Sequence, residues 1–268
     1  MKYGFIGCGK MASALVQGAI ESEALTKEQI LLSDAVPEAS ARLARDGGGS
    51  VAESNEAMVQ QCDVIVLCVK PDDALQALRD LGQALSGKLL ISIVAGLTIE
   101  SLQAAAGSGV RIVRVMPNTP ALIRRGATVF ARAASATEAD ATETERLFGA
   151  VGIVFEMKES LLNVVTGLSG SGPAFVYMVI EALADGGVLM GLPRGCAIEL
   201  AAQTVSGAAE MILETGQHPA VLRDMVASPG GTTIAGLEAL EQGGLRAALM
   251  SAVRAATERS RELGSKDK

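Results

Sequence analysis

Short apolar segments alternate with amphipathic ones through the first 157 residues. The apolar segments are rich in Ile, Leu and Val, and in the longer segments between them apolar residues recur three and four positions apart. These two periods predict strands alternating with helices, and hence an α/β fold with a parallel sheet covered on both faces. The expected strands are residues 3–6, 30–33, 64–69, 89–94, 112–115, 127–131 and 153–155, and the expected helices are residues 11–21, 37–45, 72–85, 99–106 and 138–151.

The pattern changes after about Ser160, where the strand-like segments stop and glycine-punctuated helices begin. Pro173–Leu189 carries only Glu181 and Asp185 as charges, and Arg194–Leu213 is nearly as apolar. Helices that are apolar on most sides cannot all be buried within a segment of about 110 residues. We therefore expect two domains, residues 1–158 and an all-helical dimerisation domain of residues 159–268, with the helical one packed against a second copy of itself.

The first strand leads directly into a glycine-rich turn and a helix. The stretch from Tyr3 to Ala12 reads as strand, then G-x-G-x-x-A, then helix. In this context Gly7 permits a tight turn, Gly9 lets backbone N–H groups approach a pyrophosphate, and the small Ala12 permits close helix packing. The N-terminal domain is therefore expected to be a Rossmann-like dinucleotide-binding domain.

The end of the second strand bears on the choice of dinucleotide. Ser33 and Asp34 stand there, and no Arg or Lys follows until Arg42. A carboxylate accepts the ribose hydroxyls and repels a 2′-phosphate, so Asp34 favours NADH while Ser33 leaves some tolerance. The alternative is that Asp34 caps the helix of residues 37–45.

Other polar and glycine-containing segments follow later strands. Cys68–Pro71 and Val94–Leu97 end the next two major strands, where ligands of such sheets lie. Asn55 precedes a helix and is open to two interpretations, a helix cap or a contact with the adenosine. The loop Met116–Pro120 is either a wall on the cofactor side or a rigid structural turn, because its two prolines fix the backbone.

Two glycine-rich segments in the helical half have possible roles in ligand binding. Ser228–Ile234 (SPGGTTI) places two glycines and two hydroxyls where a helix begins, an arrangement suited to an anion. The alternative is a glycine-rich connector with a threonine cap. Gly167, Gly170 and Gly172 are either packing glycines between subunits or, with Ser171, part of a substrate contact.

Composition excludes several classes of function. The net charge of −7 argues against nucleic acid and anionic membranes as partners. The four cysteines form no CxxC pair and the chain has a single histidine, His218, so we expect no metal site and reduced thiols. His218 precedes Pro219 and is expected to be solvated or capping. The longest apolar stretch, Leu89–Leu97, is too short to span a membrane and no cleavable signal precedes the first strand, so a cytoplasmic protein is expected.

The motifs in their order along the chain resemble one enzyme family. They are GFIGCGKM, VKP, SIVAG, RVMPNTPA, TGLSGSGPAFVYMVIEALADGGV, GLPR, AAQTV, ETGQHP and SPGGTTI. The sequence resembles pyrroline-5-carboxylate reductase from residue 3 to about residue 263. The first motif is shared by many dehydrogenases, whereas the last three are more particular to this family.

The resemblance implies an activity and an assembly. It implies NAD(P)H-dependent reduction of the C=N bond of 1-pyrroline-5-carboxylate to L-proline, the last step of proline biosynthesis. It also implies a homo-oligomer, at least a dimer and often a decamer, with the active site between two subunits. Family members that use NADPH often carry a small polar residue where this chain has Asp34, so both NADPH and NADH stay open as the cofactor.

The resemblance and the glycine-rich motif together assign site residues. Thr233 matches the catalytic hydroxyl near the ring nitrogen, and no role is carried over to Gly216, where some relatives have an acidic residue. The expected substrate loop is Gly230, Gly231, Thr232 and Thr233, and the expected cofactor residues are Ile6, Gly7, Gly9, Lys10, Met11, Ser33, Asp34, Asn55, Val69, Lys70, Pro71, Ala95 and Gly96.

Two rival interpretations belong to different classes. The β-hydroxyacid dehydrogenases share the glycine-rich start but use a lysine acid on the long helix, and Gly172–Met178 contains none. A non-catalytic nucleotide-binding dimer would need Gly7 and Gly9 but not Gly230–Thr233.

Overall fold

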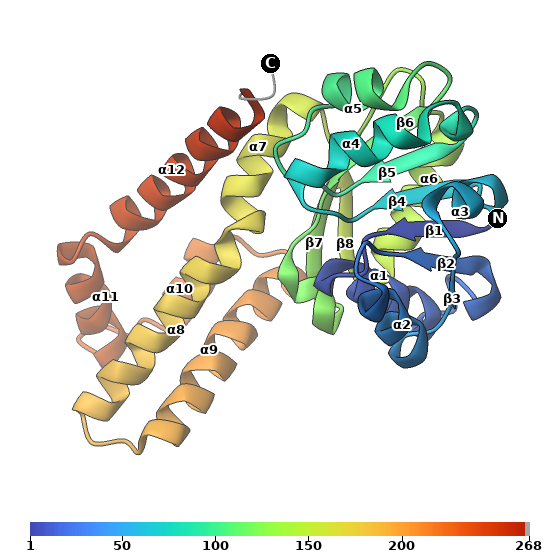
Figure 1. Ribbon diagram of the computed structural model, residues 1–268. Coiled ribbons are helices and arrows are strands. Elements are labelled where there is room, and N and C mark those ends of the chain that lie inside the picture. The colour runs from blue at the N-terminus through green and yellow to red at the C-terminus, as the bar shows by residue number, and fades with distance from the viewer. Residues whose placement is uncertain (266–268) are drawn as a thin grey trace. The chain divides into compact units, whose positions relative to one another are not determined.

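One eight-stranded sheet organises the N-terminal part of the protein, and a computed structural model describes residues 1–265 (Figure 1). Seven strands lie where the sequence predicted them, and the two-residue β3 was not predicted. The strands are β1 (Tyr3–Ile6), β2 (Ile30–Ser33), β3 (Ser50–Val51), β4 (Val64–Leu67), β5 (Leu89–Ser92), β6 (Arg111–Met116), β7 (Gly126–Arg132) and β8 (Gly152–Glu156), and their order in the sheet is β3-β2-β1-β4-β5-β6-β7-β8.

The prediction of a wholly parallel sheet was wrong at one position. The first six strands in the sheet order, from β3 through β2, β1, β4 and β5 to β6, are parallel to one another, whereas β7 pairs antiparallel with β6 and parallel with β8. The connection between β6 and β7 contains only the short 3₁₀ helix η3 (Thr119–Ile123). Such a connection is too short for a crossover, so the chain returns in the opposite direction.

Helices cover both faces of the sheet, as expected. They are α1 (Lys10–Glu21), α2 (Pro37–Asp46), α3 (Asn55–Gln61), α4 (Pro71–Leu81), α5 (Ile99–Ala106) and α6 (Glu138–Gly149), with 3₁₀ helices η1 (Lys27–Gln29) and η2 (Gly82–Leu85). Phe5 lies in the core shared with α1 and α6, and the next residue, Ile6, lies in the core shared with α4 and α5. Burial on both faces explains why the strands are almost continuously apolar.

Helices make up the rest of the described chain. They are η4 (Glu159–Leu161), α7 (Leu162–Val165), the π-helical turn η5 (Thr166–Gly170), α8 (Gly172–Leu189), α9 (Arg194–Thr215), α10 (Pro219–Met225), α11 (Thr232–Gln242) and α12 (Leu245–Ser265). By contacts the chain divides into a sheet unit, Met1–Ser171 with the described residues from Ala255 onward, and a helical unit, Gly172–Arg254. The domain boundary between residues 158 and 159 stays a prediction. Leu162 packs against Val129 and Ala131 of β7, so the chain just after residue 158 still contacts the sheet.

The helical unit has a small apolar core and a large apolar surface. Ala184, Ala197 and Ala201 are its buried apolar residues, whereas Leu189 and Met190 are 85% and 84% exposed. Glu159–Leu189 and Arg194–Thr215 are long and apolar enough, by length and composition alone, to cross a membrane. An apolar surface of this size on a helical unit indicates an interaction surface.

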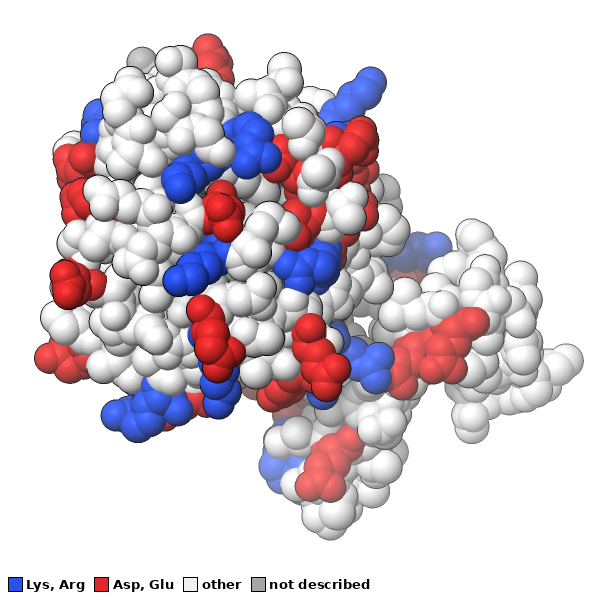
Figure 2. Space-filling view, turned by 90° about the vertical axis from the view of Figure 1, so that its right-hand side faces the viewer, with Lys and Arg blue, Asp and Glu red and all other residues white. Residues whose placement is uncertain are grey.

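The sheet unit has a different surface. Figure 2 shows Lys and Arg interspersed with Asp and Glu on the face of this unit that is in view, without a broad basic patch. Mixed charge of this kind is typical of a solvated surface rather than a nucleic-acid-binding one.

Candidate active site

The turn after β1 has room for glycine alone. Gly7 has φ +96°, and its N–H donates to the carbonyl of Ser33 at 2.8 Å. A Cβ at this position would lie 2.7 Å from the carbonyl carbon and oxygen of Cys68 and 2.9 Å from the nitrogen of Val69. The turn therefore brings the glycine-rich loop into direct contact with the backbone that follows β4.

The start of α1 is open to a ligand. Gly9 is its N-cap, with no side-chain hydrogen bond, and a Cβ on Gly9 would meet no atom within 4 Å. Lys10 and Met11 follow in the first turn, and the buried Ala12 lies in the core beneath the helix. An uncapped helix N-terminus with unobstructed backbone suits the pyrophosphate of a dinucleotide.

Asp34 interacts with the backbone of two turns. Its Oδ2 accepts a hydrogen bond from the N–H of Cys8 at 2.6 Å, and its Oδ1 accepts one from the N–H of Val36 at 2.8 Å. Val36 is the N-cap of α2 and has no side-chain cap, so Asp34 binds the residue at the helix start rather than the first helical turn. Ribose reading by Asp34 and the half-buried Ser33 stays a prediction.

Asn55 is not the cap of α3, and that interpretation was wrong. Ser54 is the N-cap, and its Oγ accepts the N–H of Ala57 at 3.1 Å. The side-chain Oδ1 of Asn55 is buried and has no hydrogen-bond partner in the described structure. An orphaned buried acceptor is costly unless a ligand or water satisfies it, so Asn55 fits a contact with the adenosine side of a cofactor.

The expected cofactor residues from separate strands lie along one edge of the sheet. Strands β1, β2, β4 and β5 are parallel. Ile6 of β1 is in register with Ser33 of β2 and with Leu67 of β4, and Leu67 is in turn in register with Ser92 of β5. The segments after these strands therefore share the carboxyl edge, where ligands of such sheets bind. Lys70 is the N-cap of α4 and Pro71 its first residue. The segments brought to this edge also contain Val69, Ala95 and Gly96, the last with φ +85°.

An ion pair between a buried arginine and a half-buried glutamate near this edge was not predicted from the sequence. Nη1 of Arg114 lies 3.0 Å from Oε1 of Glu159, and the same oxygen accepts the N–H of Ile99 at 2.7 Å. The Arg114 side chain is 6% exposed. The pair fixes the start of α5, which follows the Ala95–Gly96 segment. An arginine in the middle of an apolar strand was the available signal.

The loop Met116–Pro120 is a structural turn in the described chain. Asn118 is buried, its Oδ1 accepts the N–H of Ala127 at 2.8 Å, and its Nδ2 donates to the carbonyl of Ser169 at 3.1 Å. Both ends of the amide are thus used to hold β7 and the π-helical turn. This favours the rigid-turn interpretation of the loop.

Of the glycines between α7 and α8, Gly170 lies in close contact with another side chain. A Cβ on Gly170 would lie 2.6 Å from Cε of Met116, whereas a Cβ on Gly172 would meet no atom within 4 Å. The N–H of Ser171 donates to the carbonyl of Thr166 at 2.8 Å and closes the π-helical turn, a feature often found at functional sites. Substrate contact by Ser171 and Gly172 stays a prediction.

The loop before α11 also ends in an uncapped helix start. Gly230 has φ +66°, and Gly231 is the N-cap without a side-chain hydrogen bond. The alternative of a threonine cap was wrong, because Thr232 and Thr233 lie inside the first turn. Thr232 is exposed and Thr233 half-buried.

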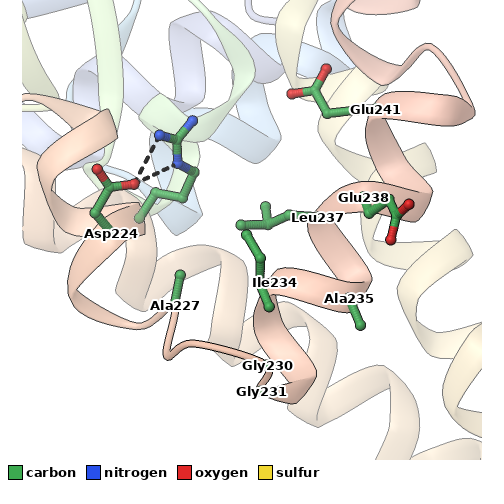
Figure 3. Close-up of a pocket in the computed structure, with 10 residues that line it drawn as sticks. Asp224, Ala227, Gly230, Gly231, Ile234, Ala235, Leu237, Glu238 and Glu241 are labelled. Carbon is green, nitrogen blue, oxygen red and sulfur yellow. Dashed lines mark hydrogen bonds and ion pairs between the residues drawn. The ribbon is translucent and has the colours of Figure 1, made fainter.

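A shallow hollow of about 530 Å³ adjoins this loop within the helical unit. Gly230 and Gly231 line it, and Figure 3 shows Asp224 and Ala227 facing Ile234 and Leu237 of α11 across it. Thr232 and Thr233 are not among its lining residues. The structure therefore joins the two glycines to a hollow but does not bring Thr233 into it.

The single histidine caps a helix, and two of the four cysteines are buried. His218 is the N-cap of α10, and its Nδ1 accepts the N–H of Ala220 at 3.2 Å, which confirms the predicted cap. Burial, followed by the charge of Asp34, raises the pKa of the Cys8 thiol to about 12, and burial also raises the pKa of the Cys68 thiol. All four cysteines are free thiols. Among residues 1–265 no three His, Cys, Asp or Glu residues gather as a metal site.

Comparison with known proteins identifies the family. The pyrroline-5-carboxylate reductase dimerisation family matches residues 159–263, and the family described as NADP oxidoreductase coenzyme F420-dependent matches residues 2–96. The pyrroline-5-carboxylate reductase of Methanosarcina acetivorans is 48% identical over 99% of this chain and 98% of its own length. The Plasmodium falciparum enzyme, solved with NADP bound, superposes with a TM-score of 0.88 at 38% identity, and the Coxiella burnetii enzyme with a TM-score of 0.93 at 35% identity, each over 98% of both chains. The chain belongs to the pyrroline-5-carboxylate reductase family.

Proposed function

We propose that this protein reduces 1-pyrroline-5-carboxylate to L-proline with NAD(P)H, the last step of proline biosynthesis. The observation that carries the proposal is the pair of helices that start at an uncapped glycine, α1 at Gly9 and α11 at Gly231. The reaction brings together two anionic molecules, a dinucleotide and a cyclic amino acid. Each helix start offers backbone N–H groups to one of them.

The residues of the chain bind and orient the reactants. The first turn of α1 holds the pyrophosphate, and the buried Oδ1 of Asn55 takes a donor from the adenosine side. Gly230–Thr233 hold the substrate carboxylate by backbone N–H groups, and the Thr233 hydroxyl faces the ring nitrogen. The cofactor supplies the hydride when bound.

A reaction in which the protein binds the reactants and the cofactor supplies the hydride needs no cluster of acid–base side chains. The carbon of a protonated imine is already electrophilic, so holding it in position supplies most of the catalysis. The raised pKa values of Cys8 and Cys68 keep these thiols protonated and exclude them as thiolate nucleophiles at neutral pH. The start of α8, Gly172–Met178, has no lysine of the kind that β-hydroxyacid dehydrogenases use as an acid, which distinguishes this chemistry from alcohol oxidation.

Asp34 directs the cofactor preference towards NADH. Its carboxylate lies at the carboxyl edge of β2, and a fixed negative charge there repels a 2′-phosphate. Replacing it by serine, as in Asp34→Ser, is expected to raise kcat/KM with NADPH relative to NADH by about tenfold, or about 1.4 kcal/mol. An unaltered ratio would show that the carboxylate does not act on the 2′ position.

The protein works as a homo-oligomer, and the larger assembly is part of the proposal. The exposed apolar residues of α8 and α9 pack against another copy, and the substrate loop is completed by a second subunit. The expected form is at least a dimer, with a decamer as the larger assembly, in the cytoplasm and without attachment to a membrane. Light scattering at micromolar concentration tests it, and a monomer mass would contradict it.

The experiment that tests the function is parallel oxidation of NADH and NADPH with 1-pyrroline-5-carboxylate. Activity with either nucleotide supports imine reduction, and the ratio reports the cofactor preference. An oligomer that binds nucleotide but oxidises neither would be a nucleotide-binding protein or would act on another imine. A matched reaction with a β-hydroxyacid and NAD⁺ is expected to show no turnover.

A further inference from the structure

The carboxylate of Asp34 joins the two backbone turns that follow β1 and β2. The N–H of Cys8 donates to Oδ2 at 2.6 Å, and the N–H of Val36 donates to Oδ1 at 2.8 Å. Beside them the N–H of Gly7 donates to the carbonyl of Ser33 at 2.8 Å. The glycine-rich turn is therefore tied to the end of β2 by two consecutive backbone N–H groups, and one of these bonds is made to a charged acceptor.

These two bonds fix the orientation of the Asp34 carboxylate. Hydrogen bonds to an ionised carboxylate are about twice as strong as neutral ones, so each oxygen is firmly held. Each carboxylate oxygen of Asp34 accepts one backbone N–H and keeps a second lone pair, so these bonds set the direction of the carboxylate without excluding a ribose contact.

The bond to Cys8 acts on the residues that meet the pyrophosphate. Cys8 lies between Gly7, whose position is fixed by the backbone of Cys68, and Gly9, the uncapped start of α1. Cys8 is fully buried, so its N–H has no access to water and needs a protein acceptor. Without the carboxylate, this N–H would be unsatisfied and the peptide preceding Gly9 could turn.

We propose that Asp34 is a positioning residue: it fixes the glycine-rich turn through the Cys8 N–H and so orients the pyrophosphate donors of α1, a role separate from any contact with the ribose. The proposal rests on the proposed function only in requiring that the chain binds a dinucleotide. The negative charge of Asp34 still opposes a 2′-phosphate, which is a separate effect.

The test is a binding cycle on the full oligomeric protein without imine. NADH and its 2′-deoxyadenosine analogue are titrated into wild type and Asp34→Ala by calorimetry. We expect Asp34→Ala to weaken both ligands by the same factor, about tenfold, the size of one hydrogen bond to a charged group. A loss confined to NADH would show that Asp34 reads the 2′-hydroxyl and would overturn the proposal, as would unchanged affinity for both.

Hydrogen exchange provides a readout that needs no ligand. In Asp34→Ala the amide of Cys8 is expected to exchange about tenfold faster in the apo protein, because its acceptor is gone. Asp46→Ala removes the same charge from the exposed far end of α2 and is expected to change neither exchange nor binding. Unchanged exchange at Cys8 would overturn the proposal.

A conservative variant separates positioning from unfolding. Asp34→Asn keeps one carbonyl acceptor, so it is expected to fold and to retain part of the affinity for both ligands. If Asp34→Ala fails to fold, the binding cycle is run with Asp34→Asn, and the same equal-factor criterion decides. Wild type that binds no NADH would contradict the proposed function, whereas the exchange result at Cys8 would still decide whether Asp34 holds the turn.

Discussion

The starts of α1 and α11 are similar in backbone but differ in their surroundings. The N-cap of α1, Gly9, has φ −76° and ψ −171°, and the N-cap of α11, Gly231, has φ −82° and ψ 177°. Neither has a side-chain cap. By contrast Ser54, Thr98 and Thr137 cap α3, α5 and α6 with their side chains. The helices α2, α4 and α9 also lack a side-chain cap, but their N-caps are Val36, Lys70 and Pro193. What α1 and α11 share is a glycine N-cap without a side-chain hydrogen bond, which leaves the backbone of the helix start unobstructed.

The surroundings of the two helix starts differ in burial. Around α1 the neighbours Cys8 and Ala12 are fully buried, and Gly7 contacts the backbone after β4. The described residues of α11 include no buried one, and Thr232 is exposed. The comparison teaches that the start of α1 is enclosed by the core of the sheet unit, whereas the start of α11 is exposed in the single chain, as the proposed site between two subunits requires.

The largest expected effect concerns the glycines of the α1 turn. Gly7→Ala forces a Cβ to within 2.7 Å of the Cys68 backbone at a positive φ, so we expect a loss of stability of about 2–4 kcal/mol and no measurable NADH binding. Thermal unfolding and NADH titration measure both.

Gly9→Ala is the matched variant for that experiment. Its φ suits alanine and its Cβ meets no protein atom, so stability should change by less than about 0.5 kcal/mol. NADH affinity should still fall, since the Cβ stands where the pyrophosphate approaches. Full NADH affinity in Gly9→Ala would place the pyrophosphate elsewhere.

The second prediction separates the two sites by disrupting the oligomer. Leu200 on α9 is 58% exposed in the single chain, and Leu200→Glu would bury a charge in an apolar subunit contact at a cost of several kcal/mol. We expect a smaller mass in light scattering, loss of imine reduction and retained NADH binding. Val51→Glu, at a similarly exposed position of β3, should leave the mass unchanged. Imine reduction by a monomeric variant would show that the α11 site is complete in one chain.

The third prediction concerns the hydroxyl of Thr233. Thr233→Ala should lower kcat/KM for 1-pyrroline-5-carboxylate, with NADH binding unchanged. The loss of transition-state stabilisation should be about 1–3 kcal/mol, the cost of a lost hydrogen bond to a polar or charged group. Thr233→Ser keeps the hydroxyl and should recover most of the activity. Steady-state kinetics with both variants measure this, and equal activity of Thr233→Ala and wild type would remove Thr233 from the site.

The sequence predicted the elements of the sheet unit better than their connections. Strands β1 and β2 were predicted to the residue because their apolar runs are bounded by turn residues. The antiparallel β7 was missed, since strand direction depends on the length of the connection and not on the apolar pattern.

Roles of single side chains were harder to predict, because they depend on hydrogen-bond partners that lie far away in the sequence. Asp34 was read as a ribose ligand or a helix cap, because nothing in the local sequence shows that the N–H of Cys8, 26 positions away, is its partner. Ser54 was passed over for Asn55 as a cap because both residue types occupy that position. A glycine between a strand and a helix has fewer possible roles. Gly7 was predicted to lie in a tight turn, and it does so with a positive φ.

The smallest expected effect concerns the thiol of Cys8, which lies beside the start of α1. The turn before α11 contains no cysteine. The pKa of Cys8 is raised from 9.0 to about 12 in the folded protein, so the unfolded chain loses this proton first as the pH rises. Stability is therefore fully present below pH 9 and is lost between pH 9 and 12, by about 1.4 kcal/mol between pH 8 and pH 10. Urea unfolding at these two pH values should show this loss, and Cys8→Ala should lose that much less. An equal slope in both proteins would mean that the thiol by the glycine-rich turn ionises as freely as in the unfolded chain, and that the turn is less closed than the α1 site requires.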